Sequence, residues 1–195
     1  LDPTKLYKVE ELGQKALEYS PTRPQIYYEI GYADLYLYQW MTEQGNSAKA
    51  QEYKDKMVAN FQQAIDLNND VMESYINMIM VLLVSDQTDK IQEYFDAMDR
   101  VNIDYKAEAS LLRLVNSAIH GKDYNWSLKF YTWLVEISPN NPDYYVGRAL
   151  SYANLGQDDL AIAEAEKVKS FGDVYIAQAE AFIDRVKSGY YKNQQ

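Results

Sequence analysis

The stretch KALEYSPTRPQIYYEIGYADLYL, residues 15–37, places two prolines three positions apart between two segments that are otherwise typical of helices. Pro21 cannot continue a preceding helix, because its ring clashes with the turn before it and its nitrogen carries no hydrogen. Pro24 suits the first turn of a new helix, where the missing hydrogen is no loss. We therefore predict that residues 20–24 form a corner between two helices.

The same motif returns later in the chain. Ser-Pro-x-x-Pro occurs at residues 20–24 and at 138–142, and a Tyr-Tyr pair follows each copy, at 27–28 and at 144–145. The two copies lie 118 positions apart, which is three periods of about 34 residues plus an insertion. A period of this length is typical of a helix-turn-helix unit that is stacked in tandem.

The repeated residues resemble the tetratricopeptide repeat (TPR) family. In that family, small residues let the two helices of a unit approach closely, and large residues fill the space between neighbouring units. The resemblance implies an all-α fold, a right-handed superhelical solenoid of stacked helix-turn-helix units with about ten helices. The unit from Pro24 matches the pattern at Tyr27, Ile30 and Gly31, and the unit from Pro142 matches it at Tyr145, Ala149, Tyr152, Ala161 and Ala165.

We interpret residues 1–195 as a single TPR array. Most of the insertion falls between Gly31 and Phe61, where we expect both helices of one unit to be about two turns longer, with their turn at 42–47. The predicted segments are the second helix of a truncated repeat (1–21), a long repeat (24–71), three further repeats (72–107, 108–141 and 142–172) and a C-terminal capping helix and tail (173–195).

The composition excludes several classes of function. The net charge is −10 and the pI is near 4.6, which argues against nucleic acid as a partner, because phosphate binding needs clustered Lys and Arg. The absence of cysteine excludes disulfides and thiolate metal sites. The longest apolar run, residues 78–84, is shorter than the roughly 18 residues of a membrane span. We therefore predict no membrane-spanning helix within residues 1–195.

The chain contains 19 tyrosines, and three of them form a pattern that suggests a binding surface. Tyr28, Tyr32 and Tyr36 are spaced by four and therefore lie on one face of a helix. Tyrosine combines a large apolar face with a hydroxyl, which suits contact with a peptide or a carbohydrate. The alternative is that neighbouring long helices cover this stripe.

The TPR resemblance places the concave groove on the first helix of each unit. Its middle positions are strongly apolar, which indicates either a hydrophobic ligand or a tightly wound superhelix that hides its own inner face. The candidate ligand-binding residues are Tyr28, Tyr32, Tyr36, Asn77, Met80, Leu112, Arg113 and Asn116.

Some TPR proteins hold a terminal carboxylate with Lys, Asn and Arg side chains, and this chain is similar to them at only two positions, Asn77 and Arg113. Tyr28, Tyr32 and Ala109 stand where that mode has Lys, Asn and Lys. Because two of the three cations are missing, most of the attraction for a carboxylate is lost. The sequence therefore argues against this mode of binding.

No arrangement of residues indicates catalysis, a cofactor or a metal. His120 is the only histidine, and it falls near the expected end of a helix, where a packed or capping role is common. The spacing of residues indicates no nucleophile-base pair and no glycine-rich phosphate loop. We therefore predict that this region is not an enzyme.

The sequence favours a non-catalytic scaffold that binds a protein or peptide partner in its groove. The alternative is an extracytoplasmic C-terminal accessory domain of an O-antigen ligase or polymerase-like glycan assembly protein of the membrane, because residues 20–29 resemble the repeat openings of such tails. A scaffold for pilus or secretion assembly is a third possibility. The chain starts at Leu1 and is interpreted as a piece of a larger bacterial protein with a possible upstream membrane domain. Its compartment stays open, with an extracytoplasmic (periplasmic or cell-surface) location slightly favoured over the cytoplasm.

Overall fold

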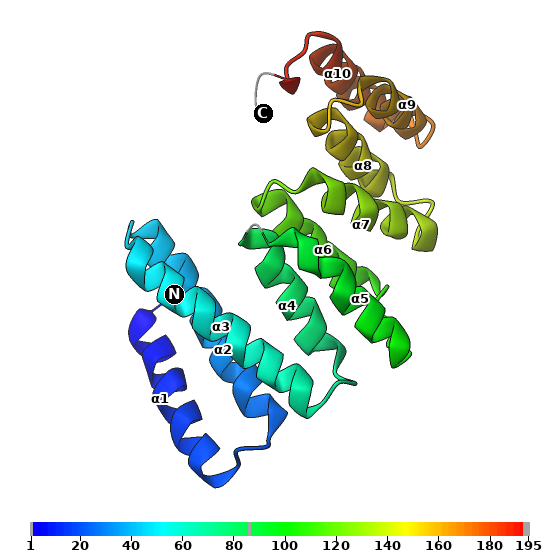
Figure 1. Cartoon of the computed structure of the whole chain (residues 1–195). Coiled ribbons are helices and arrows are strands. Elements are labelled where there is room, and N and C mark those ends of the chain that lie inside the picture. The colour runs from blue at the N-terminus through cyan, green and yellow to red at the C-terminus, as the bar shows by residue number, and fades with distance from the viewer. Residues whose placement is uncertain (1, 86, 193–195) are drawn as a thin grey trace. The chain divides into compact units, whose positions relative to one another are not determined.

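The computed structural model describes residues 2–85 and 87–192, and in these ranges its regular structure is helical throughout (Figure 1). No strand occurs among the described residues, so the prediction of an all-α chain with about ten helices is confirmed. Two short 3-10 turns, η1 (Thr88–Lys90) and η2 (Asp173–Tyr175), precede helices. The α-helices are α1 (Pro3–Tyr19), α2 (Pro24–Glu43), α3 (Ser47–Leu67), α4 (Met72–Val84), α5 (Ile91–Arg100), α6 (Glu108–His120), α7 (Tyr124–Ile137), α8 (Pro142–Asn154), α9 (Asp158–Lys169) and α10 (Ile176–Lys187).

The chain divides into two compact units, Leu1–Tyr105 with α1 to α5 and Lys106–Gln195 with α6 to α10. Within each unit, a helix packs mainly on the helices that precede and follow it in sequence. This arrangement of helical hairpins buries a core between neighbours that no hairpin buries alone.

A tyrosine hydroxyl ties the start of three helices to the turn before them. In each case the tyrosine is the fourth residue of its helix, and its hydroxyl donates to a backbone carbonyl six residues earlier. The corner predicted at residues 20–24 is one of these turns, so the hydroxyl gives the Tyr in the repeated motif a second role besides packing. The three bonds are Tyr27 to Pro21 (2.9 Å), Tyr75 to Asn69 (3.2 Å) and Tyr145 to Pro139 (3.0 Å).

Caps and turn residues fix the helix boundaries elsewhere. The Asp123 carboxylate accepts a hydrogen bond from the backbone nitrogen of Trp126 at 3.0 Å and so caps α7. Between α8 and α9, Gly156 adopts φ of 72°, a left-handed conformation that costs glycine little. In the turn before α7 the left-handed residue is Lys122, with φ of 58°, and the glycine of that turn, Gly121, precedes it with φ of −76°.

The helices α2 and α3 are the longest in the chain, with 20 and 21 residues against 13 in α4 and 14 in α7. The turn between them falls at residues 44–46. Their additional turns contribute to a buried cluster rather than to a loose extension, because Met41 is 7% and Ala50 6% exposed. The other members of the cluster are Leu6, Ala33, Leu37 and Tyr53.

Asp34 is a carboxyl group buried within this long pair. Its side chain is 0% exposed, and Oδ2 accepts a hydrogen bond from Nδ2 of Asn60 at 2.8 Å, whereas Oδ1 has no hydrogen-bond partner among the described residues. Burial raises the pKa of Asp34 to about 7, although the Asn60 bond lowers it; the charge of Glu10 raises it and that of Lys56 lowers it. Asp34 is therefore neutral in the folded chain below pH 7.

The raised pKa predicts that the stability of the first unit depends on pH. The pKa of Asp34 in the folded chain lies above the ordinary value of 3.8. The contribution of Asp34 to the free energy of unfolding is therefore complete below about pH 4 and is lost as the pH rises through 7. Relative to Asp34→Asn, the wild-type chain should lose about 2 kcal/mol of unfolding free energy between pH 5 and pH 8. Urea denaturation at both pH values measures this difference, and Asp70→Asn, at an exposed carboxyl, is the matched control. Parallel pH profiles for the wild type and Asp34→Asn would contradict the assignment.

Candidate functional site

The candidate binding residues fall on three helices, which belong to different units. Those on α2 and α4 lie in the first unit, and those on α6 lie in the second. The two sets are therefore described separately. The first set is Tyr28, Tyr32, Tyr36, Asn77 and Met80, and the second is Leu112, Arg113 and Asn116.

The three tyrosines on α2 form a continuous row of contacting rings. The ring centroids of Tyr28 and Tyr32 lie 5.0 Å apart, and those of Tyr32 and Tyr36 lie 6.4 Å apart. Tyr28 and Tyr32 both meet the ring of Phe61 on α3 edge-on, at 6.2 and 5.9 Å. Phe61 is 0% exposed, Tyr36 is 37% exposed and the other two are half-buried. We call Tyr28, Tyr32 and Tyr36 the tyrosine row; neighbouring helices support it from below and leave part of it at the surface.

Asn77 on α4 supports the tyrosine row. The hydroxyl of Tyr32 donates to Oδ1 of Asn77 at 3.0 Å, and Asn77 is 1% exposed. The bond joins α2 to α4 and fixes the Tyr32 ring in one orientation. Met80, one turn further along α4, is half-buried. A partner that lies along the tyrosine row therefore meets rings whose positions are already fixed.

A pocket of about 210 Å³ lies where α2 and α4 begin, at the Tyr28 end of the row. Two exposed carboxylates, Glu29 and Glu73, line it, and neither forms an ion pair among the described residues. Of the predicted groove residues, Tyr28 lines this pocket, whereas Val71, which reaches it from the turn before α4, was not predicted. The remaining lining residues are Pro24, Gln25, Tyr28, Val71 and Ser74.

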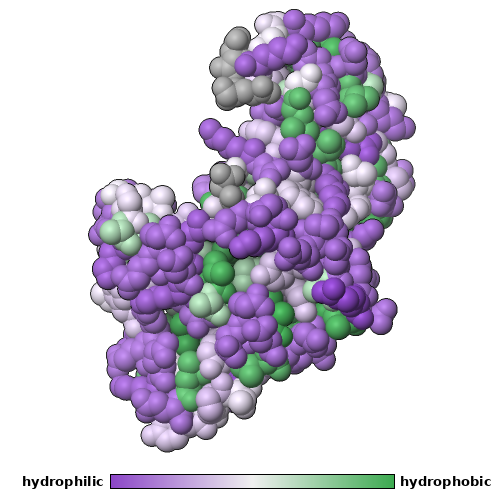
Figure 2. All heavy atoms as spheres, in the orientation of Figure 1, coloured by the Kyte–Doolittle hydropathy of each residue, from purple (hydrophilic) through white to green (hydrophobic). Residues whose placement is uncertain are grey.

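The first unit carries most of the chain's negative charge. Residues 1–105 contain 18 Asp and Glu against 9 Lys and Arg, whereas residues 106–195 contain 11 against 10. Figure 2 shows that hydrophilic residues cover most of the visible surface and that hydrophobic residues reach it in narrow strips. The first unit therefore carries an excess of nine negative charges, which favours cationic partners.

In the second unit, the three candidate residues share the surface of α6. Leu112 is 37% exposed, Asn116 is exposed and Arg113 is half-buried. Leu112 and Asn116 are spaced by four and face the same side of the helix. No pocket described in the second unit is lined by these three residues.

Metal-binding clusters and membrane-spanning helices are absent from the described part of the chain. No group of three or more His, Cys, Asp or Glu side chains there is placed to hold a metal ion. None of its helices is both long enough and apolar enough to cross a membrane. His120 is an exposed side chain in the last turn of α6.

Comparison with known proteins points to one family, although no family model matches the chain. It is 32% identical over 81 residues to small glutamine-rich tetratricopeptide repeat-containing protein 2 of Mycosarcoma maydis, covering 40% of this chain and 22% of that protein. It is 31% identical over 74 residues to DnaJ homolog subfamily C member 7 of Mus musculus, covering 37% of this chain and 15% of that protein. The chain thus spans about a fifth or less of the length of these relatives.

A solved structure shows the same fold along nearly the whole chain. The crystal structure of YrrB, described as a TPR protein with an unusual peptide-binding site, superposes with a TM-score of 0.52 at 16% identity. The match covers 95% of this chain and 87% of that one. Hairpins of this length, each packed on the next, define a helical repeat protein. The chain is thus similar to tetratricopeptide repeat proteins in sequence over about two fifths of its length and in fold over nearly all of it.

Proposed function

We propose that this chain is a non-catalytic scaffold that holds a peptide segment of a partner protein across α2 and α4 of its first unit. The observation that carries the proposal is the tyrosine row, whose rings are fixed by Phe61 below and by the bond from Tyr32 to Asn77. Rings that are ordered in advance lose little entropy on binding, so they contribute strongly to affinity. Tyrosine is also enriched among the residues that dominate protein interfaces.

The charge around the tyrosine row favours a peptide with a Lys or Arg side chain. In the pocket at the start of α2 and α4, such a side chain would meet the face of Tyr28 and the carboxylates of Glu29 and Glu73. A cation over a tyrosine ring gains about 0.5 to 1 kcal/mol at an exposed site, and the carboxylates add attraction that depends on salt. The excess of nine negative charges on residues 1–105 would also speed the encounter with a basic segment.

Selection of peptides from a displayed random library, followed by titration of the best binders, tests the proposal. The double variant Tyr28→Ala with Tyr32→Ala should bind at least about 30-fold more weakly, as expected when two anchor residues are lost. Tyr19→Ala, at a site that is 86% exposed, should change affinity less than twofold. Unchanged affinity in the folded double variant would contradict a role for the tyrosine row.

The same titrations test the preference for basic peptides. Glu29→Gln with Glu73→Gln should weaken binding about three- to tenfold at low salt, and the difference should shrink as salt is added. Glu18→Gln with Glu43→Gln, at two exposed carboxylates that line none of the described pockets, is the matched control. Selection of acidic peptides by the same surface would contradict this part of the proposal.

The accessory role in an O-antigen ligase-like membrane protein stays a separate prediction, supported by residues 20–29 alone. Neither relative nor YrrB is named as such a protein. The sequence encoded ahead of Leu1 tests it: a series of membrane spans there would support this role, and a soluble domain would contradict it.

A further inference from the structure

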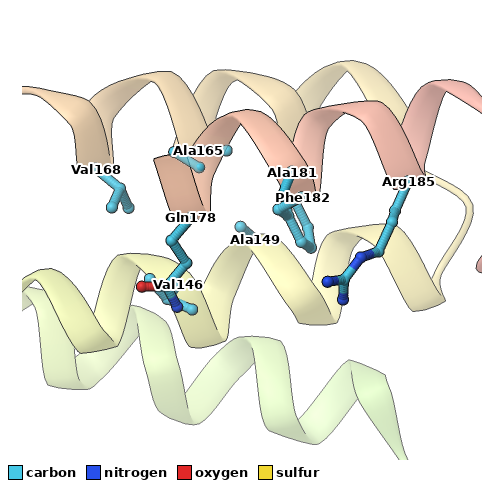
Figure 3. Close-up of a pocket in the computed structure, with 9 residues that line it drawn as sticks. Val146, Ala149, Ala165, Val168, Gln178, Ala181, Phe182 and Arg185 are labelled. Atoms are coloured by element: carbon cyan, nitrogen blue, oxygen red, sulfur yellow. The ribbon is translucent and has the colours of Figure 1, made fainter. Parts of the chain in front are cut away.

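A second pocket lies in the second unit, among α8, α9 and α10 (Figure 3). Its volume is about 210 Å³, and its walls are mainly methyl groups and one aromatic ring. None of its lining residues was among the candidate ligand-binding residues, and α10 follows no repeat pattern that could have indicated those it contributes. The lining residues are Val146, Ala149, Ala165, Val168, Gln178, Ala179, Ala181, Phe182 and Arg185.

Three exposed residues on one face of α10 form the rim of this pocket. Gln178, Ala181 and Arg185 are spaced by three and four along the helix. In Figure 3 the side chains of Gln178 and Arg185 extend from α10 toward α8, and Phe182 lies between them. The pocket therefore has an apolar interior, a neutral polar group at one end and a cation at the other.

The charge of Arg185 is available to a ligand. Arg185 forms no ion pair with a carboxylate among the described residues, whereas Arg148 on α8 is paired with Glu164 on α9 at 2.8 Å. Its neighbour is the phenol of Tyr191: burial raises the pKa of Tyr191, and the charge of Arg185 and its hydrogen bond to the phenol lower it. A guanidinium at the mouth of an apolar pocket is complementary to a carboxylate.

We propose that this pocket binds one large apolar side chain of a partner peptide, while an acidic residue next to that side chain pairs with Arg185. The volume suits the occupant, because cavities of about 150 Å³ hold a benzene-sized group. Three features of the pocket favour this occupant: the methyl-lined interior, a size that suits a single side chain, and the cation at one end. This site is separate from the tyrosine row and takes a peptide of the opposite charge, so it does not depend on the function proposed above.

Methyl NMR of the full chain tests the proposal, because alanine and valine methyls line the pocket. The probe is a capped hexapeptide with Phe-Glu at its centre and Gly and Ser on either side. It should shift the methyl signals of Ala149, Ala165 and Ala179 in a saturable way. Ala181→Trp should block the pocket and abolish the shifts, while Ala177→Trp, an exposed site on the same helix outside the pocket, should leave them unchanged.

Charge variants separate the two parts of the occupant. Arg185→Gln should weaken binding of the Phe-Glu peptide about three- to tenfold and leave the affinity for the Phe-Gln peptide unchanged. Lys187→Gln is the matched control on the same helix. Equal shifts with an Ala-Glu peptide would overturn the proposal. The proposal would also be overturned if decanoate shifted the same methyl signals in a saturable way and no peptide did. That result would assign the pocket to a lipid chain.

Discussion

Replacing Phe61 with alanine is expected to lower the free energy of unfolding by about 3 to 5 kcal/mol. Phe61 is 0% exposed on α3, and its ring fills the space that Gly31 leaves on α2, where an added Cβ would lie 3.0 Å from Cε1. Tyr28 and Tyr32 meet the same ring edge-on. Removing the ring therefore leaves a cavity and also releases the tyrosine row.

Urea denaturation followed by circular dichroism measures the loss. Phe61→Leu is the matched control, since it keeps most of the volume and should cost less than about 2 kcal/mol. If Phe61→Ala lost less than about 1 kcal/mol, α2 and α3 would not be packed through this ring, and the support assigned to the tyrosine row would be wrong.

Gly147→Ala should destabilise the second unit by about 3 kcal/mol, because α7 and α8 touch at this residue. A Cβ at position 147 would lie 2.1 Å from Cζ and 2.2 Å from Cε1 of Tyr131, closer than any van der Waals contact. The helices cannot easily separate, because Oγ of Ser127 and Oγ of Ser151 share a buried hydrogen bond of 2.9 Å. The hydroxyl of Ser151 also donates to the carbonyl of Gly147 at 3.0 Å.

A double-mutant cycle assigns this loss to the clash. Tyr131→Leu removes the distal part of the ring, so Gly147→Ala should cost less than half as much in that background as in the wild type. Thermal denaturation of the four proteins measures the coupling. Equal costs in both backgrounds would show that the clash with Tyr131 is not the cause.

The helical repeat could be predicted from local signals. The two prolines at 21 and 24 define a corner by covalent geometry alone, and the recurrence at 138–142 gives the period. The two longest helices, α2 (Pro24–Glu43) and α3 (Ser47–Leu67), lie within the segment 24–71 where the sequence predicts a long repeat. The hydrogen bonds from Tyr27, Tyr75 and Tyr145 to the turn carbonyls were not predicted. The sequence pattern does not distinguish a tyrosine that packs and also donates such a bond from one that only packs.

The parts of the site that depend on other helices could not be predicted. Spacing by four placed Tyr28, Tyr32 and Tyr36 on one face, as the ring contacts show. However, the support from Phe61 and the bond to Asn77 require the positions of α3 and α4. The burial of Asp34 likewise depends on tertiary packing, since an aspartate on a helix is ordinarily exposed.

A crystal structure of the chain with a selected basic peptide tests the central claim most directly. The proposal predicts that the peptide lies along Tyr28, Tyr32 and Tyr36, with a Lys or Arg side chain between Glu29 and Glu73. A peptide bound only to other helices, with the tyrosine row uncovered, would contradict it.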